Sequence, residues 1–275
     1  MNNPFDDIYR SMIAVDTKRC FEEPLEFPKE LHIELTNKCN LKCPFCPTGT
    51  RTCKREKGFM REDLYWAIVT EALQYKAALR FVRWGEPTLH IRCFDYIRWA
   101  NKVGIKTHLN TNGINLDIGQ VLDSGLDSIK FSLHNLDAIP SIKALIEARE
   151  SAGLDKPYVT IAELSSETHQ RARGGGREYA DSLKADRFVY APVKPLNRGG
   201  RCPKQCWELY NRLSINWDGS VVACCGSYDN QMKVGHIYDR DTLKEIWDGS
   251  GMNRYRSMEQ NGTLWQVPLC DKCAR

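Results

Sequence analysis

Three cysteines stand close together early in the chain, in the segment Cys39-Asn40-Leu41-Lys42-Cys43-Pro44-Phe45-Cys46. They follow a short apolar stretch at 31–35 that predicts a β-strand, so the thiols lie on the loop that leaves this strand. Cubane iron–sulfur clusters are normally held by four cysteine thiolates. Three thiolates therefore leave one iron open, and an open iron can bind a substrate or a cofactor.

A structural zinc site built on the pair Cys43 and Cys46 is the alternative. Zinc knuckles usually close with a second pair of cysteines or with two histidines at short range. The next cysteine, Cys53, forms no such pair. The spacing therefore favours a cluster with an open iron over zinc.

The C-x3-C-x2-C spacing, with Phe45 before the last cysteine, resembles the signature of the radical S-adenosylmethionine (radical SAM) enzymes. The resemblance implies that Cys39, Cys43 and Cys46 ligate a [4Fe–4S] cluster whose open iron chelates S-adenosylmethionine. In this family an electron from the cluster cleaves the sulfonium to methionine and a 5′-deoxyadenosyl radical. The cofactor carries the radical chemistry, while the protein supplies binding, orientation and exclusion of side reactions.

A second set of cysteines lies in the last quarter of the chain. Twelve residues separate Cys206 from Gly219, four more separate Gly219 from Cys224, and the pair Cys270 and Cys273 follows later. This pattern resembles twitch, the half-size SPASM module of the family. The resemblance implies that the four cysteines ligate one auxiliary [4Fe–4S] cluster.

Two alternatives stay open for this module. The same four residues fit a zinc ribbon, and Cys202 competes with Cys206 as a ligand, although the distance to Gly219 favours Cys206. A full SPASM domain would add several more cysteines after the gap. We therefore expect one auxiliary cluster rather than two.

Several residues at the ends of predicted strands complete the expected site. Gly85-Glu86-Pro87 resembles the family's GGEP motif, which lines the methionine amino group, although Trp84 replaces its first glycine. A carboxylate that hydrogen-bonds an ammonium is chemically sensible, so Gly85 and Glu86 are expected to contact the cofactor. A plain turn and local caps explain such positions too. Further cofactor contacts are expected from Phe45, Asn112, Ser132 and His134.

Two residues are candidates for the reaction itself. Cys225, next to Cys224, can donate a hydrogen atom to a substrate radical, but the alternative, a small apolar residue packed on the hairpin, is the one we favour. Arg187, with Arg198 and Arg201, can bind an anionic or hydroxylated substrate, and a solvated basic loop is the alternative. The remaining cysteines are expected to be ordinary thiols: Cys20, Cys53, Cys93 and Cys202.

The middle of the chain alternates predicted strands and helices. Such alternation gives parallel strands joined by right-handed crossovers. Six units match the α/β fold, a partial (β/α)6 TIM-type barrel, that the resemblance implies, and sites in such barrels lie at the strand C-termini. Strands are expected at 31–35, 79–84, 106–111, 128–133, 158–161 and 188–191, and helices at 61–77, 94–103, 116–122 and 139–151, with a short one ending at 184.

Three parts are expected along the chain. Residues 1–30 form an N-terminal extension, either a helix packed on the outside or a loop, and 31–192 form the barrel. Residues 193–275 form a small α+β iron–sulfur module. In it, Asp218-Gly219 between two apolar runs predicts a hairpin, and 242–258 reads as an amphipathic helix interrupted at Gly249 and Gly251.

Composition limits the class of protein. The 39 basic and 35 acidic residues among 275 give no reason to expect a nucleic-acid or membrane partner. No run approaches the ~18 apolar residues of a spanning helix, and the start lacks signal-peptide features. We therefore expect a cytoplasmic protein, in which the twelve cysteines serve metal ligation rather than disulfides.

The resemblance covers about 31–273, and the layout is most similar to the aminocyclitol dehydrogenases of butirosin-type antibiotic biosynthesis. It implies oxidation of a secondary alcohol on a small-molecule substrate, an aminocyclitol or sugar. The radical removes a carbon-bound hydrogen, a base takes the hydroxyl proton, and the auxiliary cluster accepts the second electron. A flavodoxin or ferredoxin would be the electron donor.

Three other functions stay open. One is radical epimerisation of a carbohydrate, with Cys225 returning a hydrogen. Another is peptide or protein modification. The shortness of residues 1–30 is an argument against this function. The third is a non-enzymatic cluster or zinc carrier, which the Cys39 loop and Glu86 together disfavour.

Overall fold

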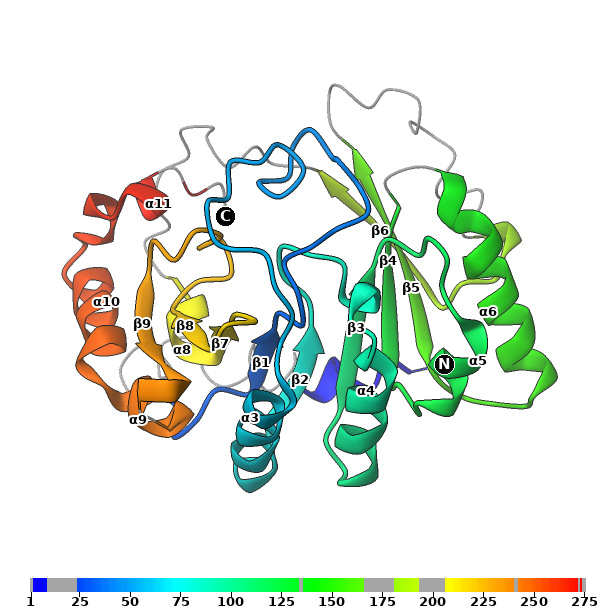
Figure 1. Cartoon of the computed structure of the whole chain (residues 1–275), viewed down its shortest axis with the longest axis horizontal. Coiled ribbons are helices and arrows are strands. Elements are labelled where there is room, and N and C mark those ends of the chain that lie inside the picture. Colours follow the sequence, from blue (N-terminus) through cyan, green and yellow to red (C-terminus); the bar gives the residue numbers. More distant parts are fainter. Residues whose placement is uncertain are drawn as a thin grey trace.

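The computed structural model describes residues 2–8, 24–133, 136–165, 181–192, 206–239, 242–271 and 273. Nine strands of this described part form one sheet, in the order β6-β5-β4-β3-β2-β1-β7-β8-β9 (Figure 1). Strands β1 to β6 are parallel and follow one another along the sheet. The strands are β1 (Glu30–Ile33), β2 (Ala78–Phe81), β3 (Thr107–Thr111), β4 (Ser128–Leu133), β5 (Tyr158–Ser165), β6 (Arg187–Pro192), β7 (Arg212–Ile215), β8 (Ser220–Val222) and β9 (Lys233–His236).

Helices connect the parallel strands as expected. Four of them lie between β1 and β5: α3 (Glu62–Gln74), α4 (Cys93–Lys102), α5 (Ile118–Asp123) and α6 (Ile139–Ser151). Because β6 and β9 are the two edges, the sheet does not close, and the partial-barrel prediction is confirmed. The later helices are α8 (Glu208–Asn211), α9 (Leu243–Asp248), α10 (Ser250–Gln260) and α11 (Pro268–Asp271), with 3-10 turns η1 (Pro87–Leu89), η2 (Leu136–Ala138), η4 (Ile237–Asp239) and η5 (Leu264–Gln266).

The C-terminal part continues the barrel sheet. Strand β7 pairs in parallel with β1, with Leu31 opposite Leu213, and β8 and β9 then add in antiparallel fashion. The predicted hairpin is confirmed, with Gly219 in its turn at φ +91°. The two cysteine-bearing parts of the chain therefore share one continuous scaffold.

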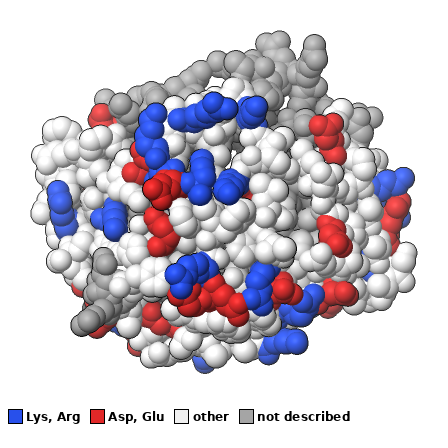
Figure 2. Space-filling view, viewed as in Figure 1, with Lys and Arg blue, Asp and Glu red and all other residues white. Residues whose placement is uncertain are grey.

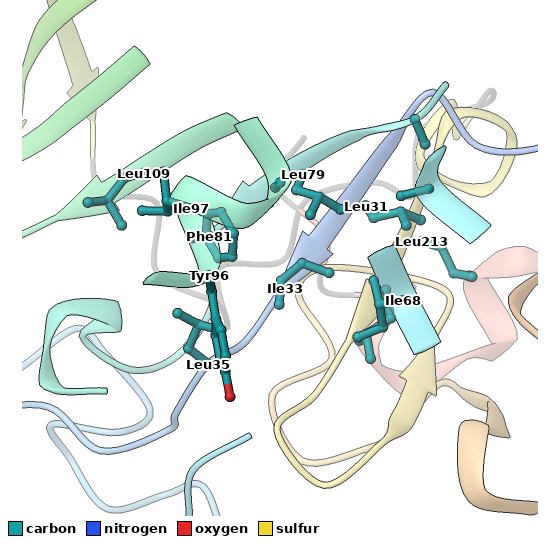
Figure 3. Close-up of a cluster of buried hydrophobic side chains, with 14 of the residues drawn as sticks. Leu31, Ile33, Leu35, Ile68, Leu79, Phe81, Tyr96, Ile97, Leu109 and Leu213 are labelled. Atoms are coloured by element: carbon teal, nitrogen blue, oxygen red, sulfur yellow. The ribbon is translucent and has the colours of Figure 1, made fainter. Parts of the chain in front are cut away.

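Side chains alternate between the two faces of the parallel strands. One face is apolar and packs on the helices, so burial of each large side chain stabilises the scaffold by about 1.5–3 kcal/mol. This outer layer contains Leu31, Ile33, Leu79, Phe81 and Leu109, packed with Ile68, Tyr96 and Ile97 of α3 and α4 (Figure 3). The opposite, inner face carries Glu30, His32, Arg80, His108, Asn110 and Lys130.

A buried group of charges lies where the inner face begins. We call Glu30, His32, Arg80 and Arg212 the floor cluster. Glu30 is fully buried, and Arg80 Nη1 lies 2.8 Å, His32 Nε2 3.0 Å and Arg212 Nε 3.4 Å from its carboxylate oxygens. Burial alone would raise the pKa of Glu30, but Arg80, His32 and Arg212 lower it below its usual range. The floor cluster thus joins β1, β2 and β7.

Residues 2–8 pack beside the floor cluster. The buried Phe5 ring meets the His108 ring edge-on at 5.4 Å, and Lys106 Nζ donates to the Pro4 carbonyl at 2.8 Å. Since His108 lies on the inner face, this segment contacts the inside of the sheet and not its outer surface. Burial also lowers the pKa of His108, which keeps its ring neutral.

Three details differ from the sequence expectation. Strand β5 runs on to Ser165, and β9 was not predicted. The helical stretch does break at Gly249, but the expected interruption at Gly251 is wrong, because Gly251 lies inside α10. A Cβ there would stand 2.8 Å from the Val234 carbonyl oxygen. This glycine therefore permits close packing of α10 on β9.

In the part of the chain that the structure describes, every helix is too short or too polar to span a lipid bilayer.

Candidate active site

The loop that carries the first three cysteines lies across the C-terminal ends of the strands (Figure 1). We call residues 38–53 the cluster loop. The Glu86 amide donates to the Lys38 carbonyl at 2.8 Å, and the Thr48 hydroxyl donates to the Trp84 carbonyl. A Cβ on Gly85 would lie only 2.0 Å from the Thr36 carbonyl oxygen. Glycine at position 85 thus lets the end of β2 seat the cluster loop.

The thiols of Cys39, Cys43 and Cys46 lie within electrostatic range of one another. Burial, with a smaller effect of the neighbouring thiols, raises the pKa of Cys39 and raises that of Cys43 to about 11. The Leu41 amide points at Cys39 Sγ, 3.4 Å away, and such hydrogen bonds stabilise cluster thiolates. Without a cation Cys39 and Cys43 stay protonated, so metal binding must displace their protons. The donor set fits an iron–sulfur cluster.

Among the described residues, no three His, Cys, Asp or Glu side chains stand close enough to hold a single metal ion. Zinc gathers four ligands about one ion at roughly 2.0–2.3 Å. A cubane cluster instead takes its thiolates on separate irons. The separation between the cysteine side chains is therefore compatible with a cluster.

Glu86 joins the ends of two strands. Its carboxylate is buried and accepts hydrogen bonds from the Thr88 amide and hydroxyl, the Thr111 hydroxyl and the Asn112 amide, at 2.8–3.2 Å. Three of these reach Oε1 and one reaches Oε2. Oε2 can therefore accept a further donor, and the predicted contact with an ammonium remains a prediction.

Four further residues were predicted to contact the cofactor, and the structure describes three of them. Asn112 Nδ2 donates to Asn40 Oδ1 at 2.7 Å, which ties the end of β3 to the cluster loop. Ser132 lies half-buried on β4, and Phe45 half-buried on the cluster loop. His134 lies outside the described residues. All four assignments stay predictions.

The second set of cysteines comes together from separate segments. Burial raises the pKa of Cys206 to about 12, and Cys273 lies within electrostatic range of it. The Gly226 amide points at Cys224 Sγ at 3.3 Å, and a Cβ on Gly226 would lie 3.9 Å from Leu269, beside Cys270. This donor set also fits a cluster. The competing ligand Cys202 is outside the described residues.

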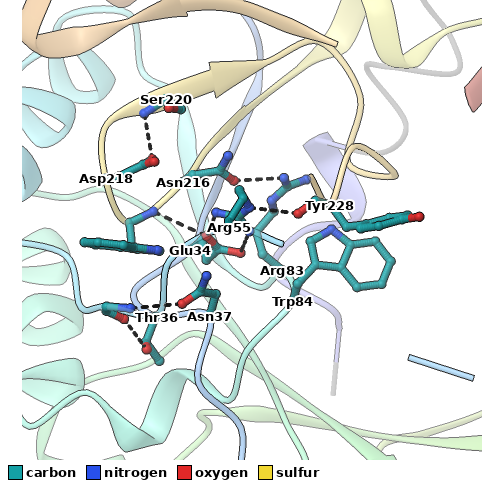
Figure 4. Close-up of polar contacts among 12 residues, drawn as sticks. Glu34, Thr36, Asn37, Arg55, Arg83, Trp84, Asn216, Asp218, Ser220 and Tyr228 are labelled. Carbon is teal, nitrogen blue, oxygen red and sulfur yellow. Dashed lines mark hydrogen bonds and ion pairs between the residues drawn. The ribbon is translucent and has the colours of Figure 1, made fainter. Parts of the chain in front are cut away.

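A buried arginine connects the barrel to the loop after β8 (Figure 4). Arg83 follows β2 closely and donates to the Cys225 carbonyl at 2.8 Å, the Ser227 carbonyl at 3.0 Å and Asn216 Oδ1 at 2.9 Å. Burial lowers the pKa of Arg83. Arg83 therefore holds the backbone directly after Cys224.

A second buried arginine connects the cluster loop to the same region. Arg55 forms two 2.7 Å hydrogen bonds with the Glu34 carboxylate, and its Nε donates to the Tyr228 carbonyl at 2.8 Å (Figure 4). Asp229 accepts from the amides of Lys54 and Arg55 at 2.7 and 3.0 Å. The two cysteine loops are thus packed into one unit.

Comparison with known proteins decides the family. A family model described as the radical SAM superfamily matches residues 33–185, more than half of the chain. The chain belongs to the radical SAM superfamily. A second model, an iron–sulfur cluster-binding domain called SPASM, matches residues 206–274. S-Adenosylmethionine, a [4Fe–4S] cluster and auxiliary cluster binding therefore belong to this radical SAM chain.

Two curated radical SAM relatives illustrate the range of the family. The tungsten-containing aldehyde ferredoxin oxidoreductase cofactor-modifying protein of Pyrococcus furiosus is 26% identical, over 83% of this chain and 71% of the relative. A PqqA peptide cyclase of Streptomyces rochei is 29% identical, over 90% of this chain and 81% of the relative.

A solved structure confirms the expected layout. BtrN, the butirosin-pathway dehydrogenase, in complex with AdoMet and 2-DOIA, superposes with a TM-score of 0.66 at 16% identity, covering 90% of this chain and 94% of BtrN. At this identity the likeness shows the fold alone.

The two predicted catalytic residues lie in different places. Cys225 lies on the loop after β8, next to Cys224, within electrostatic range of Arg83 and Arg212. Arg187 is the first residue of β6 and pairs with Thr160. Arg187 thus lies on the sheet below the strand ends, and Arg198 and Arg201 fall outside the described residues.

The residues that join the two loops were not predicted from the sequence; they are Glu34, Arg55, Arg83 and Asp229. One signal was available for Glu34. Glu34 is a charged residue at the end of an apolar strand. In the two-residue alternation of that strand, its side chain falls on the face that points into the barrel. The other three residues are recognised only through their partners.

Proposed function

We propose that this radical SAM protein is an oxidoreductase that oxidises a secondary alcohol of a small hydroxylated molecule, a sugar or an aminocyclitol. One observation carries the proposal. The three-cysteine loop and the loop that bears Cys224 are held together at the open end of one barrel by Arg55 and Arg83. The residues that would hold a cluster with an open iron and those that would hold a four-cysteine electron acceptor therefore lie on loops that are held together.

The protein's own residues hold the cluster loop in position. When bound, the cofactors supply a 5′-deoxyadenosyl radical that takes a carbon-bound hydrogen from the substrate. Gly85 and Glu86 position the cluster loop against β2 and β3, and Asn112 fixes it from the side. The buried Arg55–Glu34 pair keeps the loop seated against the C-terminal part, which limits access of water.

The surface above the cluster loop supports an acidic electron donor. Segment 38–61 holds seven Lys or Arg residues and a single carboxylate, Glu56. Lys42, Arg51 and Lys54 are exposed there, and Figure 2 shows basic side chains gathered over the loop. Such a surface attracts a negatively charged partner. An acidic flavodoxin or ferredoxin is the donor that we propose.

Turnover in deuterated water tests the proposal. Anaerobically reconstituted protein receives S-adenosylmethionine, a reductant and a panel of sugars, aminocyclitols and peptides. We expect a sugar-like product two mass units lighter, with one 5′-deoxyadenosine per turnover, and no turnover by Cys43→Ala. If no carbohydrate raises 5′-deoxyadenosine above background, the proposed substrate class is wrong.

Peptide modification is a second candidate, because a matched relative carries the name PqqA peptide cyclase. A peptide in the panel that alone raises 5′-deoxyadenosine would replace the dehydrogenase proposal. A carbohydrate product of unchanged mass except for one solvent deuterium would instead indicate an epimerase. In that case Cys225→Ala should lose product while it keeps forming 5′-deoxyadenosine.

A further inference from the structure

Three inner-face residues form a row across neighbouring strands. Lys130 on β4 lies opposite Thr160 on β5, and Thr160 lies opposite Arg187 on β6. Their chain neighbours Ile129, Ile161 and Phe188 pack in the core with the helices, so the three side chains project from the other face. We call these residues the Lys130 row.

The spacing of the row suits a small group held between two cations. Adjacent strands lie about 4.8 Å apart, so the backbones of Lys130 and Arg187 are about 10 Å apart. Both side chains are long enough to reach one group placed over Thr160 between them. The guanidinium offers a fork of donors and the ammonium a point charge.

Within the described part of the chain, no ion pair compensates the charge of the row. Elsewhere on the inner face, Arg80 and Arg212 both pair with Glu30. No salt bridge or hydrogen bond joins the side chain of Lys130 or Arg187 to any residue of the described part of the chain. Burial, with Arg80 and Arg187 nearby, lowers the pKa of the half-buried Lys130. A half-buried cation that has no anionic partner among these residues costs stability.

The row also lies at a suitable depth. Lys130 precedes Ser132 by two residues on the same face, which places it about 7 Å below the strand end. One step further down, Ser128 contacts His108 in the layer of the floor cluster and Phe5. The Lys130 row therefore lies on the inner face, between the level of the floor cluster and the strand ends that the cluster loop crosses.

We propose that the Lys130 row binds an anionic group of the substrate, a carboxylate or a phosphate, and holds its reacting carbon toward the strand ends. This inference rests on the proposed function and narrows its substrate class. The row repels the ammonium of an aminocyclitol, so a sugar acid or sugar phosphate fits better than an aminosugar. Arg187 then positions substrate and is not a base for the reaction.

Competitive labelling of lysines tests the site directly. Anaerobic holoenzyme is methylated with trace isotopic formaldehyde and cyanoborohydride, with increasing inorganic phosphate or acetate, and each lysine is followed by peptide mass spectrometry. We expect either anion to slow labelling of Lys130 at least threefold. Lys143, exposed on α6 and 3.7 Å from Glu147, is the internal control and should not change. The more effective anion identifies phosphate or carboxylate.

Two variants separate binding from indirect effects. Arg187→Met should abolish the protection of Lys130, whereas Arg254→Met, an exposed change on α10, should preserve it. Phosphate or acetate should also raise the Tm of the wild type and leave that of Lys130→Met unchanged. If neither anion alters labelling of Lys130 relative to Lys143, or if Arg187→Met keeps full protection, the inference is wrong.

Failure of this inference differs from failure of the proposed function. Release of 5′-deoxyadenosine without substrate reports on the radical machinery alone. Wild-type protein that cleaves S-adenosylmethionine but shows no anion protection refutes only the anion site. Protection in a protein that never cleaves S-adenosylmethionine supports the site and refutes the radical function.

Discussion

The two cysteine regions of this protein are built in different ways. In the cluster loop, three thiols come from eight consecutive residues, and the loop is seated by the backbone at Gly85 and Glu86. In the C-terminal region, ligands from separate segments meet only because β7 pairs with β1 and α11 returns toward the loop after β8. The first region is a local structure, and the second is a tertiary one.

This difference indicates which kinds of substitution would disrupt each cofactor site. A local loop fails when its seat changes, while a tertiary site fails when the contacts between distant segments are lost. Arg55 and Arg83 couple the two, because they cross from the barrel side to the loop after β8. Substitutions can therefore be chosen that disrupt one region, the other region or the connection between them.

The largest effect is expected from removing one ligand in each region. Cys43→Ala and Cys270→Ala should each lose about half of the bound iron, since each chain holds two clusters. Cys43→Ala should form no 5′-deoxyadenosine. Cys270→Ala should still cleave S-adenosylmethionine yet release no oxidised product. Iron analysis, electron paramagnetic resonance and chromatography measure these outcomes, and cleavage by Cys43→Ala would contradict the assignment of the open iron.

A smaller but still large effect is expected at the seat of the cluster loop. In Gly85→Ala the new methyl meets the Thr36 carbonyl, so the loop must move. Displacement of about 1 Å costs roughly 100-fold in rate, and we expect that loss in 5′-deoxyadenosine formation. The control is Gly119→Ala, in an exposed part of α5, which should stabilise the fold by up to about 1 kcal/mol. Equal rates for both variants would show that the contact at Gly85 is unimportant.

The smallest effect is expected from loosening the connection between the regions. Arg83→Met leaves the Cys225 and Ser227 carbonyls without their donor, at a cost of about 1–3 kcal/mol. The Tm should fall by about 2–4 °C per kcal/mol, and the auxiliary cluster's reduction potential should shift while the spectrum of the first cluster stays constant. Arg254→Met is the matched control on the surface. Identical potentials in both variants would argue against coupling through Arg83.

Much of the fold followed from local patterns. Strand and helix periods predicted β1 to β4 and α3 to α6 to within a few residues, because a core-facing element must repeat its apolar side chains at its own period. The Asp218-Gly219 turn is likewise local, since its backbone needs a glycine at positive φ. The cluster loop was predictable for the same reason, as its three ligands are fixed by spacing along the chain.

The sequence by itself thus determined the barrel units, the hairpin and the three-cysteine loop. Only the tertiary structure decided the pairing of β7 with β1, the reach of Arg83 to Cys225, and the alignment of Lys130 with Arg187. The physical reason is strand register. Side chains that share a level on the inner face come from strands tens of residues apart, and only hydrogen bonding between those strands brings them to one place.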